Sequence, residues 1–354
     1  MAKKNNSDLT GVKEIARRAN VSIATVDRVI HNRVGVSAKT KSKVNKIIQE
    51  LNYQPNLLAQ RLASRKIFNL ATFIPIGSEE TSFWEAPLKG IEQAATEIKQ
   101  FGVVVNSFFY DQNSKDSFAK QSKLVLRSNP DGILFAPSFI EESVEFSEKC
   151  KAKNIPYVLI DSDLPNQSSL SYMGPDLFHS GYLSAHLISY LIKESDRILI
   201  VNISKEIDSH HHLLKKEGGF RSYFLDRKIN SQISKIDIRN TDYLSIEKIL
   251  AKELNSGKEV KVIFVTNSRV SDVAKYIEKN QIDVLLVGYD FLPKNIDYLE
   301  KEVIDFLICQ KPLEQAYRGV MALYQHLAFA IPAEKKYFMP IDIITKENHV
   351  YYRN

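Results

Sequence analysis

Polar side chains follow several apolar runs in the C-terminal part of this chain, at the point where each run ends. Asp161 ends PYVLID, Asp290 ends LLVGYD and Gln310 ends FLICQ. Carboxylates and amides hydrogen-bond the hydroxyl groups of small ligands, and flat aromatic rings cover the apolar face of such molecules. These residue types therefore predict a binding site for a sugar or a similar small polar compound. The strand-end residues of this kind are Phe83, Trp84, Asp161, Ser162, Asn267, Asp290 and Gln310.

Each of these residues, taken alone, is better explained as a helix cap or an ordinary loop residue. Their recurrence at five strand ends favours the binding site, because ligands of open α/β sheets bind beyond the carboxyl ends of the strands. The elements that precede these residues must therefore be the parallel strands of such sheets.

From Phe68 onward, short apolar runs alternate with segments of helical periodicity. Strands that are apolar on both faces and separated by helices predict parallel sheets covered on both sides. Two such sheets predict a body of two lobes with a cleft between them. The predicted strands include LATFIP, VVVNSFF, GILFAP, PYVLID, RILIVNI, residues 231–238, VKVIFVT and DVLLVGYD. The predicted helices are residues 84–101, 114–128, 143–154, 179–194, 213–226, 244–254 and 271–280.

The first part of the chain has a different pattern, that of a helix-turn-helix over residues 12–31. Asn20 is expected to end the first helix, and the Ser22 hydroxyl is placed to accept a backbone N–H at the start of the second, residues 23–30. A third helix is predicted over residues 38–51. The apolar stripe of the first helix consists of Val12, Ile15, Ala16 and Ala19.

The second helix is predicted to turn Val26, Val29 and Ile30 inward. Its outward residues lie near its N-terminus, where a recognition helix reaches base edges in the major groove of DNA. Arg28 is the best candidate, because its planar fork pairs with two acceptors on guanine. A contact to phosphate is the alternative, since phosphate contacts outnumber base contacts. The outward residues are Ile23, Ala24, Asp27 and Arg28.

The positive charge of the chain is concentrated in its first 66 residues. They hold 14 basic and four acidic residues, a net charge of +10, whereas the whole chain carries +6. The other 288 residues therefore carry −4. This distribution favours phosphate neutralisation by the N-terminal part over a generally basic, solubilising surface.

The segments VKEIARRANVSIATVDRVIHN and GVSAKTKSKVNKIIQELNYQPNLLAQRLA resemble the head and hinge of the LacI/GalR family of bacterial transcription regulators. The resemblance implies a hinge helix near residues 55–64 that forms on DNA, with Leu62 wedged into the minor groove. Without this resemblance, Leu62 would be read as an ordinary apolar residue of a linker. Most members carry Ser at the position of Asp27, where a carboxylate needs a hydrogen-bond donor, for example cytosine N4. The expected DNA-contacting residues are Ser22, Ile23, Ala24, Thr25, Asp27, Arg28, His31, Asn32 and Leu62.

Residues 70–344 resemble the type I periplasmic binding protein fold, most closely its ribose-binding branch. The resemblance implies that Phe83 and Trp84 sandwich the ligand together with Tyr243, and that the polar strand-end residues bind its hydroxyl groups. Two positions depart from the pattern, because Lys216 and Ser162 stand where the family usually has Arg. Lys keeps the charge but loses the bidentate fork. The expected ligand contacts are thus the seven strand-end residues together with Lys216 and Tyr243.

Several classes of function are opposed by the sequence. It has no apolar span of about 18 residues and no export signal in MAKKNNSDL, so neither a membrane partner nor export is expected and the predicted location is the bacterial cytoplasm, at the nucleoid. Cys150 and Cys309 are expected to be reduced and structural. No motif for catalysis or cofactor binding occurs, so neither an enzyme nor a cofactor is expected. His210, His211 and His212 cannot all face one metal ion on a regular element, which favours a polar loop or cleft rim.

The predicted fold class is α/β, with an all-α helix-turn-helix head and a two-lobed, doubly wound parallel-sheet effector domain. The predicted divisions are residues 10–54 for the head, 55–66 for the hinge and 67–354 for the effector domain. The predicted function is a homodimeric DNA-binding regulator, of the repressor type, whose operator affinity depends on a small sugar-like effector. Two alternatives remain: a constitutive DNA-binding protein with a vestigial cleft, and an extracytoplasmic sugar receptor.

Overall fold

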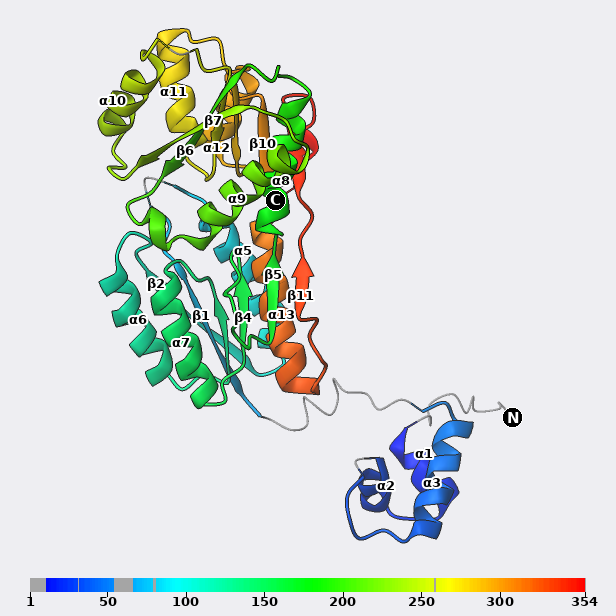
Figure 1. The fold of residues 1–354 in the computed structure, drawn as a ribbon. Coiled ribbons are helices and arrows are strands. Elements are labelled where there is room, and N and C mark those ends of the chain that lie inside the picture. Colours follow the sequence, from blue (N-terminus) through cyan, green and yellow to red (C-terminus); the bar gives the residue numbers. More distant parts are fainter. Residues whose placement is uncertain (1–10, 31, 54–65, 79–80, 258, 354) are drawn as a thin grey trace. The chain divides into compact units, whose positions relative to one another are not determined.

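Three short helices form the N-terminal unit of the chain. The computed structural model describes residues 11–30, 32–53, 66–78, 81–257 and 259–353. The chain divides into two units, Met1–Arg65 and Lys66–Asn354, here called the head and the body (Figure 1). His31, Leu62 and nearly all of the predicted hinge lie outside the described residues.

The helices of the head are α1 (Val12–Ala19), α2 (Ile23–Ile30) and α3 (Ala38–Glu50), which confirms the predicted helix-turn-helix and third helix. Asn20 ends α1 in the left-handed conformation, with φ of 53°, as asparagine tolerates. The Ser22 Oγ accepts a hydrogen bond from the Thr25 N–H at 3.1 Å, so the predicted cap of α2 is present. The head core consists of Ile15, Ala16, Ala19, Val26, Val29, Val44 and Ile47.

The body contains two six-stranded sheets, each in its own lobe (Figure 1). Lobe 1 has the strand order β11-β5-β4-β3-β1-β2, and all its neighbouring pairs are parallel. Lobe 2 has the order β12-β10-β9-β8-β6-β7, with β12 antiparallel and the rest parallel. The fold class predicted from the sequence is therefore confirmed. The lobe 1 strands are β1 (Phe68–Pro75), β2 (Val103–Tyr110), β3 (Gly132–Phe135), β4 (Tyr157–Ile160), β5 (Ser171–Gly174) and β11 (Lys336–Phe338). The lobe 2 strands are β6 (Arg197–Ile203), β7 (Gln232–Ile238), β8 (Val262–Val265), β9 (Leu285–Tyr289), β10 (Phe306–Cys309) and β12 (Asp342–Ile344).

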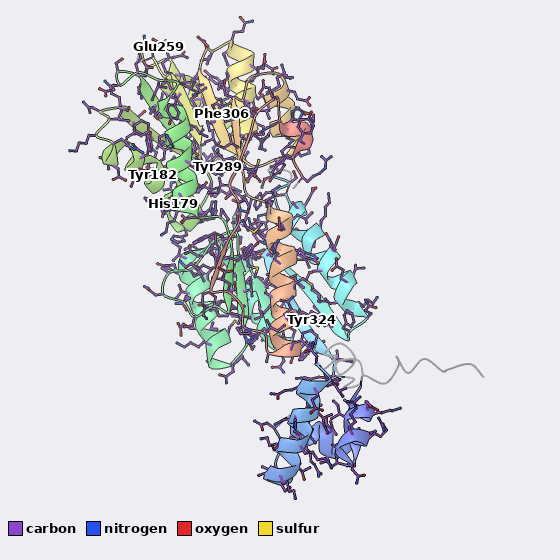
Figure 2. All side chains as sticks on the ribbon, turned by 90° about the vertical axis from the view of Figure 1, so that its right-hand side faces the viewer. His179, Tyr182, Glu259, Tyr289, Phe306 and Tyr324 are labelled. Carbon is purple, nitrogen blue, oxygen red and sulfur yellow. The ribbon has the colours of Figure 1, made fainter. Side chains whose placement is uncertain are left out.

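Helices cover both faces of each sheet, because alternate strand residues point to opposite sides. In β6, Ile198 and Ile200 pack against α8 and α9, whereas Leu199 and Val201 pack on the side of α10 and α11. Figure 2 shows side chains filling both lobes, with Tyr289 labelled in lobe 2 and Tyr324 in lobe 1. The lobe 1 helices are α5 (Glu85–Lys99), α6 (Lys115–Arg127), α7 (Ile140–Ala152) and α13 (Pro312–Phe329). The lobe 2 helices are α8 (Leu177–Ser189), α9 (His211–Asp226), α10 (Tyr243–Leu254), α11 (Val270–Asn280) and α12 (Pro293–Glu300). Two 3₁₀ turns, Ile207–Ser209 and His349–Tyr351, complete the regular elements described.

The chain crosses between the lobes after β5, after β10 and after β11, since the elements that follow belong to the other sheet. The second crossing leads into α13, which packs on lobe 1 although it follows a strand of lobe 2. The sequence pattern did not predict α12, α13 or β11.

Two pairs of helices, α8 with α9 and α5 with α13, pack closely at a glycine. A Cβ at Gly219 would lie 1.8 Å from the Phe178 carbonyl oxygen, and one at Gly90 would lie 2.1 Å from that of Leu313.

Candidate functional site: a polar pocket between the lobes

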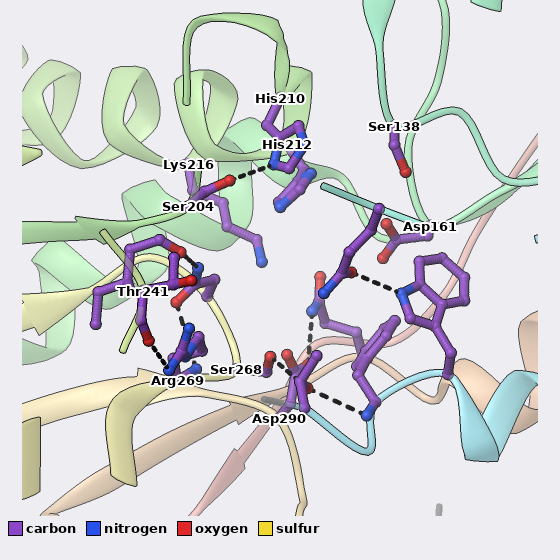
Figure 3. A pocket seen from close by; sticks show the side chains of 17 residues that line it. Ser138, Asp161, Ser204, His210, His212, Lys216, Thr241, Ser268, Arg269 and Asp290 are labelled. Carbon is purple, nitrogen blue, oxygen red and sulfur yellow. Dashed lines mark hydrogen bonds between the residues drawn. The ribbon is translucent and has the colours of Figure 1, made fainter. Parts of the chain in front are cut away.

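A pocket of about 680 Å³, including its solvent-open part, lies between the two lobes at the carboxyl ends of the strands (Figure 3). This position is the one expected for a ligand site in doubly wound sheets. Its lining comes from both lobes, so a bound molecule contacts both at once. The lining residues are Thr81, Phe83, Trp84, Gln112, Ser138, Asp161, Ile203, Ser204, His210, His212, Lys216, Thr241, Asn267, Ser268, Arg269, Asp290 and Gln310.

Most of the ligand contacts predicted from the sequence are brought together here, and two are not. Ser162 is buried next to the pocket, and its hydroxyl donates a weak hydrogen bond to the Asp163 carbonyl at 3.4 Å. Tyr243 begins α10, and its ring lies 3.8 Å from the Lys275 Nζ, while Thr241 lines the pocket from the same loop. The predicted residues that line the pocket are Phe83, Trp84, Asp161, Lys216, Asn267, Asp290 and Gln310.

Two aspartates are presented by strongly bent strand ends. Asp161 follows β4 and Asp290 follows β9, and both have positive φ, 64° and 76°. Aspartate tolerates this left-handed conformation better than most residues. The positive φ ends each strand abruptly. The buried Asn295 of α12 fixes the second bend, because its Nδ2 donates to the carbonyl oxygens of Tyr289 and Asp290 at 3.0 Å and to that of Ser268 at 3.1 Å.

Aromatic rings form one wall of the pocket. Phe83 and Trp84 are both buried and meet edge to face, with ring centroids 5.1 Å apart. The Trp84 Nε1 donates to the Gln112 side-chain oxygen at 3.2 Å, which fixes the indole. The fixed indole has a flat aromatic face, which suits the apolar face of a sugar ring.

Lys216 projects from α9 into the pocket, where it is almost fully buried. Its Nζ lies 3.6 Å from the centroid of the Tyr289 ring, a cation–π contact. Burial lowers the pKa of Lys216, and the carboxylates of Asp290 and Asp161 oppose this shift. Burial raises the pKa of Asp161 to about 6, with Lys216 opposing the shift and Asp290 adding to it.

The environment of Asp290 also favours the protonated form of its carboxyl group. Burial raises its pKa, and Lys216 and the Gln310 side chain act in the opposite direction. The Gln310 Nε2 donates to the Asp290 Oδ1 at 2.9 Å, whereas the Gln310 Oε1 is buried without a hydrogen-bond partner among the described residues. A buried acceptor without a partner is costly, so a ligand donor at this position would be stabilising.

The histidine run lies at the junction of the two lobes. His210 and His212 line the pocket, with ring centroids 5.4 Å apart, so they lie at the cleft, which is one of the two positions predicted for this run. Burial lowers the pKa of His210 to about 4 and that of His212 well below its ordinary value, which leaves both rings neutral at pH 7. His211 begins α9, and its Nδ1 lies 3.0 Å from the Asp163 carbonyl of lobe 1.

The lobes also touch directly at the pocket's edge. The hydroxyls of Thr81 in lobe 1 and Ser268 in lobe 2 are hydrogen-bonded at 3.0 Å. The rings of Phe139 and His210 approach to 5.8 Å between centroids. Together with the His211 contact, these interactions connect the two lobes at the edge of the pocket.

Several lining residues were missed in the sequence although a local signal existed. Gln112, Ser138, Ser204 and Thr241 each follow a strand within three residues, as the predicted residues do. They would have been included if the polar residues that follow every predicted strand had been counted as candidates. Arg269 forms a local ion pair with Asp272 at 2.8 Å and donates to the Thr241 carbonyl at 2.7 Å; the second contact is long-range and has no sequence signal.

The second helix of the head presents its predicted outward face to solvent. Ile23, Ala24 and Arg28 are exposed, while Val26 and Val29 are buried. Asp27 is partly exposed, and its Oδ2 accepts a hydrogen bond from the Arg33 Nη1 at 3.1 Å.

Two further predicted residues sit at the rim of this face. Thr25 is partly buried and bonded to Ser22, as described above. Asn32 has φ of 54°, and its side-chain oxygen accepts a hydrogen bond from Lys41 of α3. An outward arginine, small apolar side chains and nearby lysines suit a surface that meets phosphates and base edges.

Comparison with known protein families identifies both units. The model of the bacterial regulatory proteins of the lacI family matches residues 11–56, and that of a periplasmic binding protein domain matches residues 71–330. This chain carries a LacI-family head on a body that belongs to the periplasmic binding protein domain family. These two parts are the helix-turn-helix head and the two-lobed body described above.

Two curated relatives of this chain are a control protein and a transcriptional regulator. Catabolite control protein A of Staphylococcus aureus (strain N315) is 34% identical over 148 residues, which is 42% of this chain and 43% of the relative. This match therefore spans less than half the length of that relative. The HTH-type transcriptional regulator MalR of Streptococcus pneumoniae (strain TIGR4) is 25% identical over 285 residues, 79% of this chain and 83% of MalR.

Solved structures resemble the body. A putative LacI transcriptional regulator from Bacteroides fragilis has a TM-score of 0.75 and 28% identity, covering 81% of this chain and 100% of that chain. GanP, a glucose-galactose binding protein from Geobacillus stearothermophilus, has a TM-score of 0.71 and 21% identity, covering 80% and 99%. At 21% identity, the likeness to GanP shows only that the two folds are similar.

The described part of the chain contains neither a membrane-spanning helix nor a metal-binding cluster. None of its helices has the length and apolar character that crossing a membrane requires. No group of three or more His, Cys, Asp or Glu side chains there is arranged to hold a metal ion. Cys150 and Cys309 are both free and buried, as predicted.

Proposed function

We propose that this chain is a sequence-specific DNA-binding transcriptional regulator whose DNA affinity is set by a small polar ligand, a sugar or sugar derivative. The observation that carries the proposal is the combination, in one chain, of an exposed α2 face with a polar pocket between two lobes. The relatives named as regulators support the DNA-binding part. The aromatic wall and the buried hydrogen-bonding groups support the ligand part.

The head is proposed to bind operator DNA through α2. Arg28 pairs with a guanine edge, Ile23 and Ala24 contact thymine methyl groups, and Leu62 of the hinge enters the minor groove. Ser22, Thr25, Asp27, His31 and Asn32 complete this interface. A head of this size reads only a half-site, so two copies are required to read a pseudo-palindrome, and we propose a homodimer formed through one face of the bodies.

The body is proposed to act as the ligand-controlled part. A ligand that contacts both lobes binds the closed state better than an open one, so it shifts the population towards closure. Closure then changes the spacing of the two hinges in the dimer and thereby the affinity for DNA. No catalytic step is included, and the proposed location is the bacterial cytoplasm, where the protein reaches its DNA.

The DNA-binding part is tested by selecting bound duplexes from a random library with the purified protein. We expect a pseudo-palindromic consensus, and Arg28→Ala should remove preference at one position of each half-site. Arg18 of α1 is bound to Glu14 in an ion pair, so Arg18→Ala is a control with the same charge change. No enrichment over random duplex at moderate salt would refute the proposal.

The ligand-binding part is tested by fluorescence, because Trp84 is the only tryptophan of the chain and lines the pocket. Titration with pentoses and hexoses should change its emission, and the same sugars should alter operator affinity. A constitutive DNA-binding protein with a vestigial cleft is the second candidate. It predicts operator binding that no ligand alters and no ligand-dependent rise in melting temperature.

A further inference from the structure

The ionisable groups of the pocket do not balance. Asp161 and Asp290 supply two carboxylates, and Lys216 supplies one ammonium group. Arg269 also lines the pocket, but Asp272 neutralises it at 2.8 Å. With the two histidines neutral at pH 7, the ionised pocket carries one net negative charge.

Two acceptors of the pocket have no partner among the described residues. The carboxylate of Asp161 forms no hydrogen bond or ion pair within the described parts of the chain, although its backbone N–H donates to Gln315. Lys216 is directed to the Tyr289 ring and forms no ion pair with either aspartate. The Gln310 Oε1 is likewise a buried acceptor without a described partner. The Asp161 carboxylate and the Gln310 Oε1 are therefore acceptors open to a donor of the ligand, while the Lys216 Nζ is a donor open to one of its oxygens.

We propose that the ligand is a sugar or polyol that carries one protonated amino group, and that Asp161 is the residue that selects the amine. The proposal rests on the proposed function, in that the pocket must bind a small polar ligand. The amine donates to the Asp161 carboxylate, while hydroxyl groups of the same molecule engage Asp290, Asn267 and Gln310. The aromatic wall of Phe83 and Trp84 covers the ring.

The physical reason is the cost of burying an uncompensated charge. A neutral sugar in the closed cleft leaves the site with its negative charge buried, which is expensive in a medium of low dielectric constant. A monocation brings the net charge of the occupied site to zero and forms a charge-assisted hydrogen bond. A phosphorylated or carboxylated sugar would add negative charge and is disfavoured. Burial raises the pKa of both aspartates, and Lys216 opposes this shift.

The test compares matched pairs of sugars that differ only in an amino group in place of a hydroxyl. Full-length protein is titrated with glucosamine and glucose, galactosamine and galactose, and mannosamine and mannose, slightly below neutral pH. Trp84 emission reports binding, and calorimetry confirms it. In at least one pair we expect the amino sugar to bind about tenfold more tightly than its parent, as a charge-assisted bond in place of a neutral one implies.

Two variants separate selection by charge from general damage to the site. Asp161→Asn removes the net charge and should abolish or reverse the preference for the amine. Asp111→Asn is the matched control, because Asp111 follows β2, is exposed and does not line the pocket. It should keep the preference of the unaltered protein.

The outcomes distinguish this inference from the proposed function. Equal or tighter binding of a neutral parent in the unaltered protein would overturn the amine assignment and leave ligand control of DNA binding intact. A preference for the amine that persists in Asp161→Asn would overturn the role of Asp161. Absence of binding by every sugar of both kinds would count against both proposals.

Discussion

The side-chain oxygen of Gln315 accepts a hydrogen bond from the backbone N–H of Asp161 at 2.9 Å. The same side chain donates through its Nε2 to the Gln310 carbonyl at 2.7 Å. Gln315 stands in the first turn of α13, which follows the crossing from lobe 2 to lobe 1. One buried amide therefore joins the ligand-facing strand ends of the two lobes.

Replacing this amide should destabilise the body. Gln315→Leu leaves a buried N–H and a buried carbonyl without partners, each of which costs about 1–3 kcal/mol. We expect a loss of at least 2 kcal/mol or so in the free energy of unfolding, measured by urea denaturation. Gln325→Leu on the exposed side of the same helix is the control. Equal effects of the two substitutions would show that the bridging bonds contribute nothing.

Adjacent glycines of α9 should respond in opposite ways to alanine. A Cβ at Gly219 would lie 1.8 Å from the Phe178 carbonyl oxygen of α8, whereas one at Gly218 would meet nothing within 4 Å. Gly219→Ala should force the helices apart and cost about 1–3 kcal/mol or more. Gly218→Ala should be neutral or stabilise by up to about 1 kcal/mol, because alanine favours the helix. Thermal melting of the two variants decides, and a stable Gly219→Ala would contradict the helix contact.

The acidity of Asp161 makes the stability of the ligand-free body depend on pH. Its pKa is about 6 in the folded protein, above the ordinary value of 3.8, so between these values the folded state holds a proton that the unfolded state has lost. Ionisation of Asp161 therefore destabilises the body as pH rises through this window. Asp161→Asn should be more stable than the unaltered protein at pH 7, by up to about 3 kcal/mol, and this gain should vanish near pH 4.

Denaturant titration at several pH values measures the effect. Asp111→Asn serves as the exposed control and should show no such gain. A difference between Asp161→Asn and the unaltered protein that stays constant from pH 4 to pH 7 would mean that the Asp161 carboxyl titrates normally.

The ion pair between Asp27 and Arg33 should weaken non-specific DNA binding. Asp27→Ser, on the proposed DNA-binding function, frees the Arg33 guanidinium for a phosphate. Affinity for random duplex should then rise, and the slope of log K against log salt should steepen by roughly 0.9, one further phosphate contact. Fluorescence anisotropy over a salt series measures this slope. Glu50→Gln, an exposed change of equal charge in α3, is the control, and identical slopes in the two variants would exclude a specific role for the pair.

Whether Asp27 also reads a base is a separate question. If it accepts from cytosine N4, Asp27→Ser should change the sequence selected from a random duplex library at one position of each half-site. An unchanged consensus would show that Asp27 acts only through Arg33.

The sequence alone determined most of the elements, but not α12, α13 or β11, and it determined the edge of the sheets where the site lies. Strand and helix periodicity are local properties, and Asp161 and Asp290 follow directly from the runs that they end. The helices of the head could be predicted equally well, because the end of α1 at Asn20 and the Ser22 cap of α2 depend only on neighbouring residues. Burial of Val26 with exposure of Arg28 needs only helical spacing.

The tertiary structure alone decided which loop residues reach the pocket. Thr241 lines it and Tyr243 does not, because the turn into α10 directs the tyrosine ring to Lys275. The placement of α13 on lobe 1 depends on contacts with strands more than 100 residues earlier in the chain. The net charge of the pocket likewise depends on the tertiary structure, because Lys216, Asp161 and Asp290 come from separate segments of the chain. Periodicity fixes which way a side chain points on its own element, but the approach of distant elements is set by packing that no local pattern encodes.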